Sequence, residues 1–389
     1  LFILLFIASC VQPPKFSITN IKQLSFDGDN GEAYFNYDNS KLIFQSKRGD
    51  SACDKLYLID ANGESLIPFS LTDGAFTCAY YSLNDAYIFF SSTMQDGSEC
   101  PEVYQHPNPR KYIWPLRNYE IFRWDGSEAV QLTYYRVYNA EATIHPTEEK
   151  IIFTSLRDGD IDLYEMNYNG GDVKRITTEF GYDGGAFYSP NGKNIVWRAW
   201  YPENEEEKEK WSLNLKNRYI DAVPLDIYVA KRDGSARKRL TNNGATNWAP
   251  SWHPDGEHIV FSSNMDDWRD DYNAFGSNFE LYIINIHTSK LTRLTHNDTF
   301  DSFPVISDGG KFDDGWLCTS DLATRDEEGF LTVVGRADDV ILSGGENVHP
   351  EEIESVINSL DGVVESAVFG VPDKVWGQKV VAVLWVETS

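Results

Sequence analysis

Five segments of the chain repeat one pattern of apolar and polar positions: a short strand, a turn and a second strand. The segment 247–263, NWAPSWHPDGEHIVFSS, shows it most plainly. Its Pro254-Asp255-Gly256 predicts a turn, because proline presets φ and glycine accepts positive φ. The β-branched and aromatic residues of 258–263 then predict a half-buried strand. Each copy of the pattern is therefore expected to form a β-hairpin.

An aromatic residue ends the second strand of every copy. These aromatics stand 45, 64, 44 and 64 residues apart and are Phe44, Phe89, Phe153, Trp197 and Phe261. A third strand follows with an apolar-aromatic pair such as Leu163-Tyr164, and most copies close on a pair such as Ile176-Thr177. Four short strands per unit with a period of about 40–50 residues predict a β-propeller.

The two longer intervals contain insertions, at residues 95–117 and 200–224. The alternating acidic and basic run at 203–210 predicts a short exposed helix. The aromatic and acidic side chains of the insertions suit a binding surface, and they equally suit packing of the insertions themselves.

A sixth copy begins at residues 301–304 and is not completed. Ser307 takes the position that Ser189 has in the fourth copy, but Gly315 stands where the aromatic is expected. The repeat therefore ends after Lys311. Residues 18–25 are expected to form the closing strand of the last blade, so that the ring has no free edge.

The predicted fold is mainly β. It is a propeller with five recognisable blades and an incomplete sixth over residues 18–311, followed by a small α+β domain over residues 312–389. The net charge of −26 and the aromatic content of 14% suit a self-repelling surface over strand-rich blades, and they argue against a nucleic-acid partner. We find no metal-binding or nucleophile pattern, and we interpret His145 and His253, which hold equivalent turn positions, as structural.

The first ten residues, LFILLFIASC, resemble the end of a bacterial lipoprotein signal peptide. The resemblance implies cleavage before Cys10 and attachment of a lipid to its thiol, and Val11 favours the outer membrane. The absence of a methionine and a basic region before this run predicts that the chain is a fragment at this end. A buried strand with an incidental cysteine is the alternative.

Cys53, Cys78 and Cys100 lie in the first two blades. In an oxidising compartment two of them are able to pair. We predict Cys78 with Cys100, because both flank the insertion of blade two, and three free thiols are the alternative.

Two sequences carry a family resemblance for residues 18–311: YDGGAFYSPNGKNIVWRA in blade four and APSWHPDGEHIVFSS in blade five. They resemble the TolB-like, WD-like propellers of bacterial envelope proteins. The resemblance implies a periplasmic module that binds proteins or peptides, without a cofactor and without catalysis by the propeller itself.

The sequence after residue 314 has a different character. Two short strands and a Gly-rich turn precede an amphipathic helix at 351–360, and strands are expected at 363–371 and 379–386. Several motifs in this tail, including Thr319-Ser320-Asp321 and Gly335-Arg336-Ala337-Asp338, resemble the C-terminal part of acyl-CoA synthetases of the adenylate-forming superfamily.

The resemblance assigns roles to individual residues of the tail. It implies that Asp321 and Arg336 contact the ribose and nucleotide of AMP, and that Asp338 is the hinge. Gly344 and Gly345 would line the pantetheine channel, where a side chain has no room. ATP and CoA are the cofactors implied for the tail.

Nothing in residues 1–311 resembles the phosphate loop or the acyl pocket of those enzymes, and their catalytic lysine lies beyond residue 389. We therefore expect no ligase activity from this chain. We expect instead a non-catalytic, lipid-anchored periplasmic propeller that was joined artificially to part of a cytoplasmic ligase. The alternative is a fragment of an ATP-dependent acyl-CoA synthetase with an appended propeller.

Overall fold

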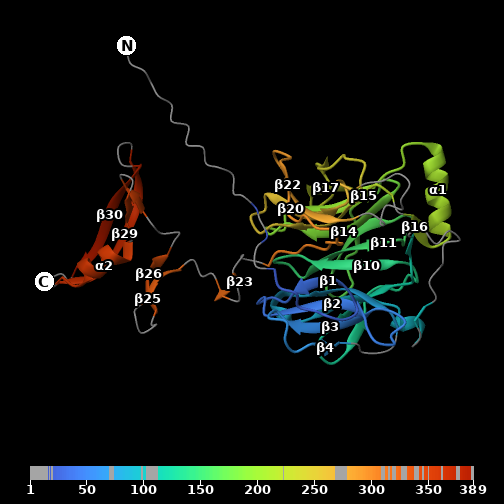
Figure 1. Cartoon of the computed structure of the whole chain (residues 1–389), viewed down its shortest axis with the longest axis horizontal. Helices are drawn as coiled ribbons and strands as arrows, with labels where there is room; N and C mark the ends of the chain where they lie inside the picture. The colour runs from blue at the N-terminus through green and yellow to red at the C-terminus, as the bar shows by residue number, and fades with distance from the viewer. Residues whose placement is uncertain are drawn as a thin grey trace, which may run out of the picture. The chain divides into compact units, whose positions relative to one another are not determined.

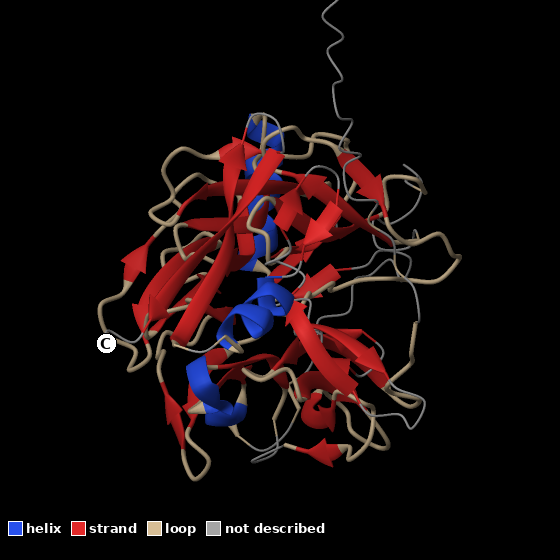
Figure 2. Cartoon of the chain, turned by 90° about the vertical axis from the view of Figure 1, so that its left-hand side faces the viewer, coloured by secondary structure: helices blue, strands red, loops and turns tan. Residues whose placement is uncertain are grey.

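A computed structural model shows two compact units, residues 1–309 and 310–389 (Figure 1). The structure describes residues 16, 18, 21–69, 74–97, 100–101, 113–221, 223–267, 278–307, 312–313, 316–317, 321–325, 331–336, 341–343, 346–348, 350–360, 362–373 and 377–386. Strands dominate both units and helices are few (Figure 2).

Five four-stranded antiparallel sheets follow one another along the first unit. The first two sheets are β1 (Asp29–Phe35), β2 (Lys41–Lys47), β3 (Lys55–Asp60), β4 (Ile67–Pro68), and β5 (Phe76–Tyr81), β6 (Ile88–Ser92), β8 (Glu120–Trp124), β9 (Ala129–Gln131). The third and fourth are β10 (Asn139–Ile144), β11 (Lys150–Ser155), β12 (Asp162–Asn167), β13 (Lys174–Arg175), and β14 (Tyr182–Tyr188), β15 (Asn194–Trp200), β17 (Asp226–Lys231), β18 (Lys238–Arg239). The fifth is β19 (Asn247–Trp252), β20 (His258–Ser263), β21 (Glu280–Asn285), β22 (Leu291–Arg293). The predicted five blades are confirmed.

In four of the five blades, the aromatic of the second strand and the tyrosine of the third strand are cross-strand partners, whereas Phe89 of blade two lies opposite Arg123. Phe153 lies opposite Tyr164, and their ring centroids are 5.8 Å apart. Blade five repeats the arrangement with Phe261 and Tyr282 at 5.9 Å. Paired rings of this kind stabilise adjacent strands by about 0.2–1 kcal/mol. The two sequence signals therefore record one packing contact inside each of these four blades.

The closing Leu-Thr or Ile-Thr pair also has a structural cause. The Thr177 hydroxyl accepts a hydrogen bond of 2.9 Å from the backbone N–H of Leu163, at the start of the third strand. The same bond, also 2.9 Å long, joins Thr133 to Ile121, Thr241 to Ile227 and Thr295 to Leu281. The fourth strand is too short to pair with this N–H group of the third strand. The threonine that follows the fourth strand satisfies the group instead.

The sixth position of the ring contains residues 301–307, which are not part of any sheet. The Ser251 hydroxyl donates to the carbonyl oxygen of Pro304 at 2.6 Å. At the N-terminus, the Phe16 ring contacts the ring of His258 in blade five, and Leu24 packs against blade one. Residues 21–26 are not a strand, contrary to the prediction for 18–25. Among the described residues, the sixth position offers no sheet with which such a strand could pair.

The two insertions pair with each other. Strand β7 (Ile113–Pro115) of blade two pairs with β16 (Tyr219–Asp221) of blade four. Helix α1 (Glu205–Lys216) lies beside β16 (Figure 1), and the side chain of Asn204 caps it by accepting from the N–H of Glu207 at 3.0 Å. The expected short helix is present, but it is not wholly exposed, because Trp211 is buried in the cluster beneath the insertions.

The predicted disulfide is wrong. Cys53 is bonded to Cys100, with their Cα atoms 5.7 Å apart, and Cys78 is a buried free thiol. Cys78 stands at a bulge of β5, which directs its side chain to the propeller axis. It is therefore unable to meet Cys100 in the insertion.

The second unit begins with the two-stranded sheets β23 (Phe312–Asp313) with β24 (Trp316–Leu317), and β25 (Asp321–Arg325) with β26 (Leu331–Arg336). A four-stranded sheet follows in the order β28-β27-β30-β29, made of β27 (Ile341–Ser343), β28 (Glu346–Val348), β29 (Val363–Asp373) and β30 (Gly377–Val386). Helix α2 (Pro350–Asn358) packs on β29. The α+β prediction for the tail is confirmed.

Candidate functional site

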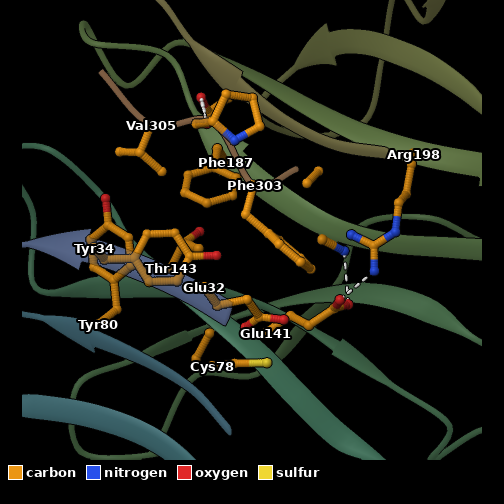
Figure 3. A pocket seen from close by; sticks show the side chains of 15 residues that line it. Glu32, Tyr34, Cys78, Tyr80, Glu141, Thr143, Phe187, Arg198, Phe303 and Val305 are labelled. Carbon is orange, nitrogen blue, oxygen red and sulfur yellow. Dashed lines mark hydrogen bonds and ion pairs between the residues drawn. The ribbon is translucent and has the colours of Figure 1, made fainter. Parts of the chain in front are cut away.

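The innermost strand of every blade has a bulge at the same place. Each bulge contains one residue with positive φ, and residues 301–307 supply a sixth. These residues are Glu32, Cys78, Glu141, Gly185, Ala249 and Phe303. Residues other than glycine rarely adopt positive φ, and those that do tend to occur at functional sites. All six residues line one cavity on the propeller axis, which we call the channel floor (Figure 3).

Glu141 is fully partnered at the channel floor. Its carboxylate accepts from the Arg198 guanidinium, from the Thr154 hydroxyl at 2.7 Å and from the Gly185 N–H at 2.9 Å. Glycine is required at 185, because a Cβ atom there would overlap Nη1 of Arg198. The missing side chain of blade four thus makes room for the cation that neutralises the carboxylate of blade three.

Glu32 occupies the same position in blade one but has far fewer partners. Both Glu32 and Glu141 are 8% exposed. Burial raises the pKa of Glu32 to about 7; a hydrogen bond from the Cys78 thiol lowers it and the Glu141 charge raises it. Burial also raises the pKa of Cys78, so the thiol stays protonated and donates. Glu32 therefore adds a second carboxyl group beside the Glu141–Arg198 pair.

Three aromatic rings stand above the channel floor, and we call them the collar. The ring centroids of Tyr34 and Tyr80 are 5.0 Å apart, and Phe187 lies 5.9 Å from Tyr34 and 6.1 Å from Tyr80. Beyond the collar is a cavity of about 170 Å³, which we call the channel mouth. Its lining comes from every blade, at 35–37, 39, 80–83, 144, 146, 187–190 and 251–252, and from the sixth position, at 305–307.

The paired insertions close the channel below the floor. The Arg198 guanidinium lies 3.8 Å from the centre of the Trp248 ring, and Trp114 of β7 packs on Trp248 at 4.8 Å. Trp248 belongs to the large apolar cluster beneath the insertions, and Trp114 packs against that cluster. The insertions pack on each other and on the propeller, which is one of the two roles expected for them. In the described part of the chain, the channel has a mouth, a collar and a charged floor, and Glu32 and Phe303 of the floor also line a separate cavity of about 280 Å³ beside blade one.

His145 and His253, which hold equivalent turn positions in two blades, line neither the channel floor nor the channel mouth. Nε2 of His145 lies 3.2 Å from the carbonyl oxygen of Gly192, and its Nδ1 accepts from backbone N–H groups. These contacts hold the turn of blade three, as expected for a structural residue. Within the described residues, no group of three or more His, Cys, Asp or Glu side chains is placed to hold a metal ion.

In the tail, the structure brings two predicted nucleotide contacts together. Asp321 begins β25 and Arg336 ends β26, and they are directly opposite in the strand register. Asp338, Gly344 and Gly345 lie outside the described residues, as does Cys10. No described helix is both long and apolar enough to cross a membrane.

Sequence reasoning missed the channel floor, although a signal was present. Glu32, Glu141 and Gly185 each stand twelve residues before the aromatic of their blade, and Cys78 stands eleven before its own. Arg198 directly follows Trp197 in β15, where the other residues from 195 to 200 are apolar. A charged residue at a buried strand position indicates a buried partner, and the repeat offset locates it.

The two units resemble different known proteins. The propeller is similar in fold to the crystal structure of TolB from Acinetobacter baumannii, with a TM-score of 0.51 and 17% identity, covering 71% of this chain and 56% of that one. Residues 352–388 match the AMP-binding enzyme C-terminal domain.

Curated relatives match the tail alone. The 2-succinylbenzoate–CoA ligase of Listeria monocytogenes serotype 4b is 53% identical over 78 residues, which are 20% of this chain and 17% of that enzyme. The long-chain-fatty-acid–CoA ligase FadD13 of Mycobacterium tuberculosis is 51% identical over 73 residues, 19% of this chain and 14% of that enzyme. The chain therefore spans less than a fifth of the length of these relatives. It combines a TolB-like propeller with the C-terminal domain type of CoA ligases.

Proposed function

We propose that the propeller is a non-catalytic module that binds a protein or peptide of the bacterial cell envelope at its channel mouth. The observation that carries the proposal is the mouth itself, a cavity that takes its lining from all five blades and from residues 305–307. A surface built this way offers several convergent contacts to one narrow ligand. The net charge of −26 favours a partner with positive charge.

We place the module in the periplasm, anchored to the outer membrane through a lipid on Cys10. The lipobox-like run that ends at Cys10 supports this location. The Cys53–Cys100 disulfide supports it too, because such bonds persist in oxidising compartments. Intact-mass analysis of the protein from membranes of its source should show a diacylated N-terminal cysteine, and a soluble, unmodified protein would contradict the anchor.

We further propose that the tail is an incomplete ligase domain joined artificially to the propeller. The repeat ends after Lys311, inside a hairpin, where a natural domain boundary is unfavourable because both halves lose packing. The resemblance of the tail implies ATP and CoA, which are cytoplasmic, and we propose that this chain uses neither. Single DNA molecules sequenced across codons 295–330 should not carry both sides of the join. Intact molecules would establish a genuine fusion.

The alternative function is that of an ATP-dependent acyl-CoA synthetase fragment, favoured by the opposed Asp321 and Arg336. Incubation of the full chain with ATP, CoA and a panel of carboxylates separates the two proposals. We expect no acyl-CoA, because the tail alone provides no phosphate cradle for the leaving pyrophosphate. Formation of acyl-CoA would favour the alternative.

Peptide selection tests binding at the mouth. A displayed random-peptide library is selected on the full chain, and the best peptide is titrated by calorimetry. Tyr37 lines the mouth and is 62% exposed, so Tyr37→Ala should weaken binding at least about tenfold, or about 1.4 kcal/mol. Tyr134 is 70% exposed and lies outside the mouth, so Tyr134→Ala is the matched control. Equal binding by both variants would place the peptide elsewhere and contradict the proposal.

A further inference from the structure

The channel floor has an imbalance of charge. It contains two buried carboxyl groups, Glu32 and Glu141, and one guanidinium, that of Arg198 (Figure 3). The guanidinium is committed to Glu141 by an ion pair and lies against Trp248 on its far side. Its own exposure is 3%, so it is fixed in place. Glu32 is left without a cation of its own.

Glu32 is also poorly satisfied as a hydrogen-bond acceptor. Its hydrogen bond within the described structure comes from the thiol of Cys78, which is a weak donor. An ionised carboxylate accepts about four hydrogen bonds, and buried polar groups are normally satisfied. This unsatisfied acceptor indicates that the floor is built to receive a hydrogen-bond donor.

The size of the floor limits the chemistry of that ligand. The cavity has a volume of about 30 Å³, about twice the roughly 10–15 Å³ that a cavity needs to hold one water molecule. A primary ammonium group is of this size, whereas a guanidinium or a trimethylammonium group is larger. The described residues provide no set of three or more His, Cys, Asp or Glu ligands for a metal ion.

The route to the floor favours an unbranched chain. Tyr80, Phe187, Ser251 and Val305 line both the floor and the mouth, so these side chains lie between the two cavities. A chain of methylene groups passes such a constriction against the ring faces at little cost. Aromatic faces also attract an ammonium group as it passes.

We propose that the channel floor binds a primary ammonium group against Glu32, carried on an unbranched alkyl chain that enters through the mouth. In a peptide, this group is either a lysine side chain or the N-terminal amine. The identity of the carrier rests on the proposed peptide-binding function, but the ammonium site itself is testable without a peptide.

The direct test uses n-butylammonium chloride as the probe, titrated into the full chain by ligand-observed NMR at fixed ionic strength. The wild type should bind it, and Glu32→Gln should weaken binding at least tenfold. Glu64 is an exposed carboxylate of the same blade, so Glu64→Gln removes the same charge and should bind like the wild type. Equal binding by Glu32→Gln and the wild type would overturn the proposal.

A second measurement needs no variant. The wild type should bind n-butylammonium at least tenfold more tightly than n-butyltrimethylammonium, because only the first fits the floor. Equal affinity for both probes, or tighter binding of the larger one, would overturn the proposal even if Glu32→Gln does not fold.

The peptide chosen at the mouth then identifies the carrier. Acetylation of its N-terminus should abolish binding if the terminal amine enters the channel, and lysine-to-norleucine changes should abolish binding if a lysine enters. If neither change matters while Tyr37→Ala still weakens binding, the ammonium carrier is wrong and the peptide-binding function stands. If no peptide binds but n-butylammonium does, the peptide-binding function is wrong and the ammonium site stands.

Discussion

Glu32 and Glu141 occupy the same position in two blades and have different surroundings. Both lie on the bulge of an innermost strand, with φ of 53° and 60°. Glu141 is served by Thr154 of its own blade and Arg198 of the next. The corresponding residues for Glu32 are Gln45, whose side chain accepts from the N–H of Cys78 in blade two, and Phe90, which is apolar.

The comparison shows that the repeat and the local sequence decide different things. The repeated bulge fixes where six side chains meet. The residue that follows the aromatic of each second strand then decides whether a carboxyl group at that place is neutralised. Glu141 is neutralised by Arg198 and has a structural role, whereas Glu32 has no such partner and is available to a ligand.

The largest expected effect comes from breaking the ion pair between Glu141 and Arg198. Arg198→Met leaves Glu141 buried without a cation, which should lower the free energy of unfolding by about 3–5 kcal/mol. Urea unfolding followed by tryptophan fluorescence measures this. Lys174→Met, at an exposed strand position, is the control and should cost less than about 0.5 kcal/mol. Adding Glu141→Gln to Arg198→Met should recover part of the loss, and an Arg198→Met protein as stable as the control would contradict the assignment.

Glu32, the carboxyl group without a cation, should make the free energy of unfolding depend on pH. The folded-state pKa of Glu32, about 7, lies above its ordinary value of 4.5, so the protonated form is favoured by folding. Its stabilisation is fully present below pH 4.5 and is lost as the pH rises through 7. Relative to Glu32→Gln, the wild type should therefore lose about 3 kcal/mol of unfolding free energy between pH 4.5 and 8.

Subtracting the unfolding free energy of Glu32→Gln from that of the wild type cancels the contributions of the other titrating groups. The charges that face Glu32 are those of Glu141, Arg198 and Asp54, beside the Cys78 thiol. Urea unfolding of both proteins at four pH values measures the effect. A difference that does not change with pH would mean that the pKa of Glu32 is ordinary.

The smallest effect concerns the thiol. Cys78→Ala removes the donor to Glu32, and Ala249 shows that alanine adopts positive φ at this position of the repeat. The cost should be about 1 kcal/mol larger at pH 8, where Glu32 is charged, than at pH 5. Equal costs at the two pH values would mean that the thiol contributes only packing.

Much of the fold follows from contacts that are local in the sequence. In four of the five blades the aromatic of the second strand meets the tyrosine of the third strand, so the pair marks the blade although the loop between the two residues varies in length. The closing threonine bonds to the same third strand. In the tail, the helix and the long strands were predicted close to the observed α2, β29 and β30, because their periodicity is strong.

The channel floor depends on contacts between blades, which no local pattern specifies. Arg198 reaches Glu141 across 57 residues, and only the missing side chain of Gly185 allows it. The disulfide was assigned wrongly for a related reason. Position in the chain suggested Cys78, but the bulge turns that residue to the axis and leaves Cys53 to pair with Cys100.

The measurement that tests the account most directly is the infrared difference spectrum of the full chain at neutral pH, with and without n-butylammonium chloride. The account predicts a carbonyl stretch from a protonated carboxyl group that is present in the wild type, is reduced in Glu32→Gln and decreases when the probe binds. This change follows because an ammonium group stabilises the ionised form of Glu32. If the probe leaves the spectrum of the wild type unchanged, or changes that of Glu32→Gln equally, Glu32 is not the receptor at the end of the channel.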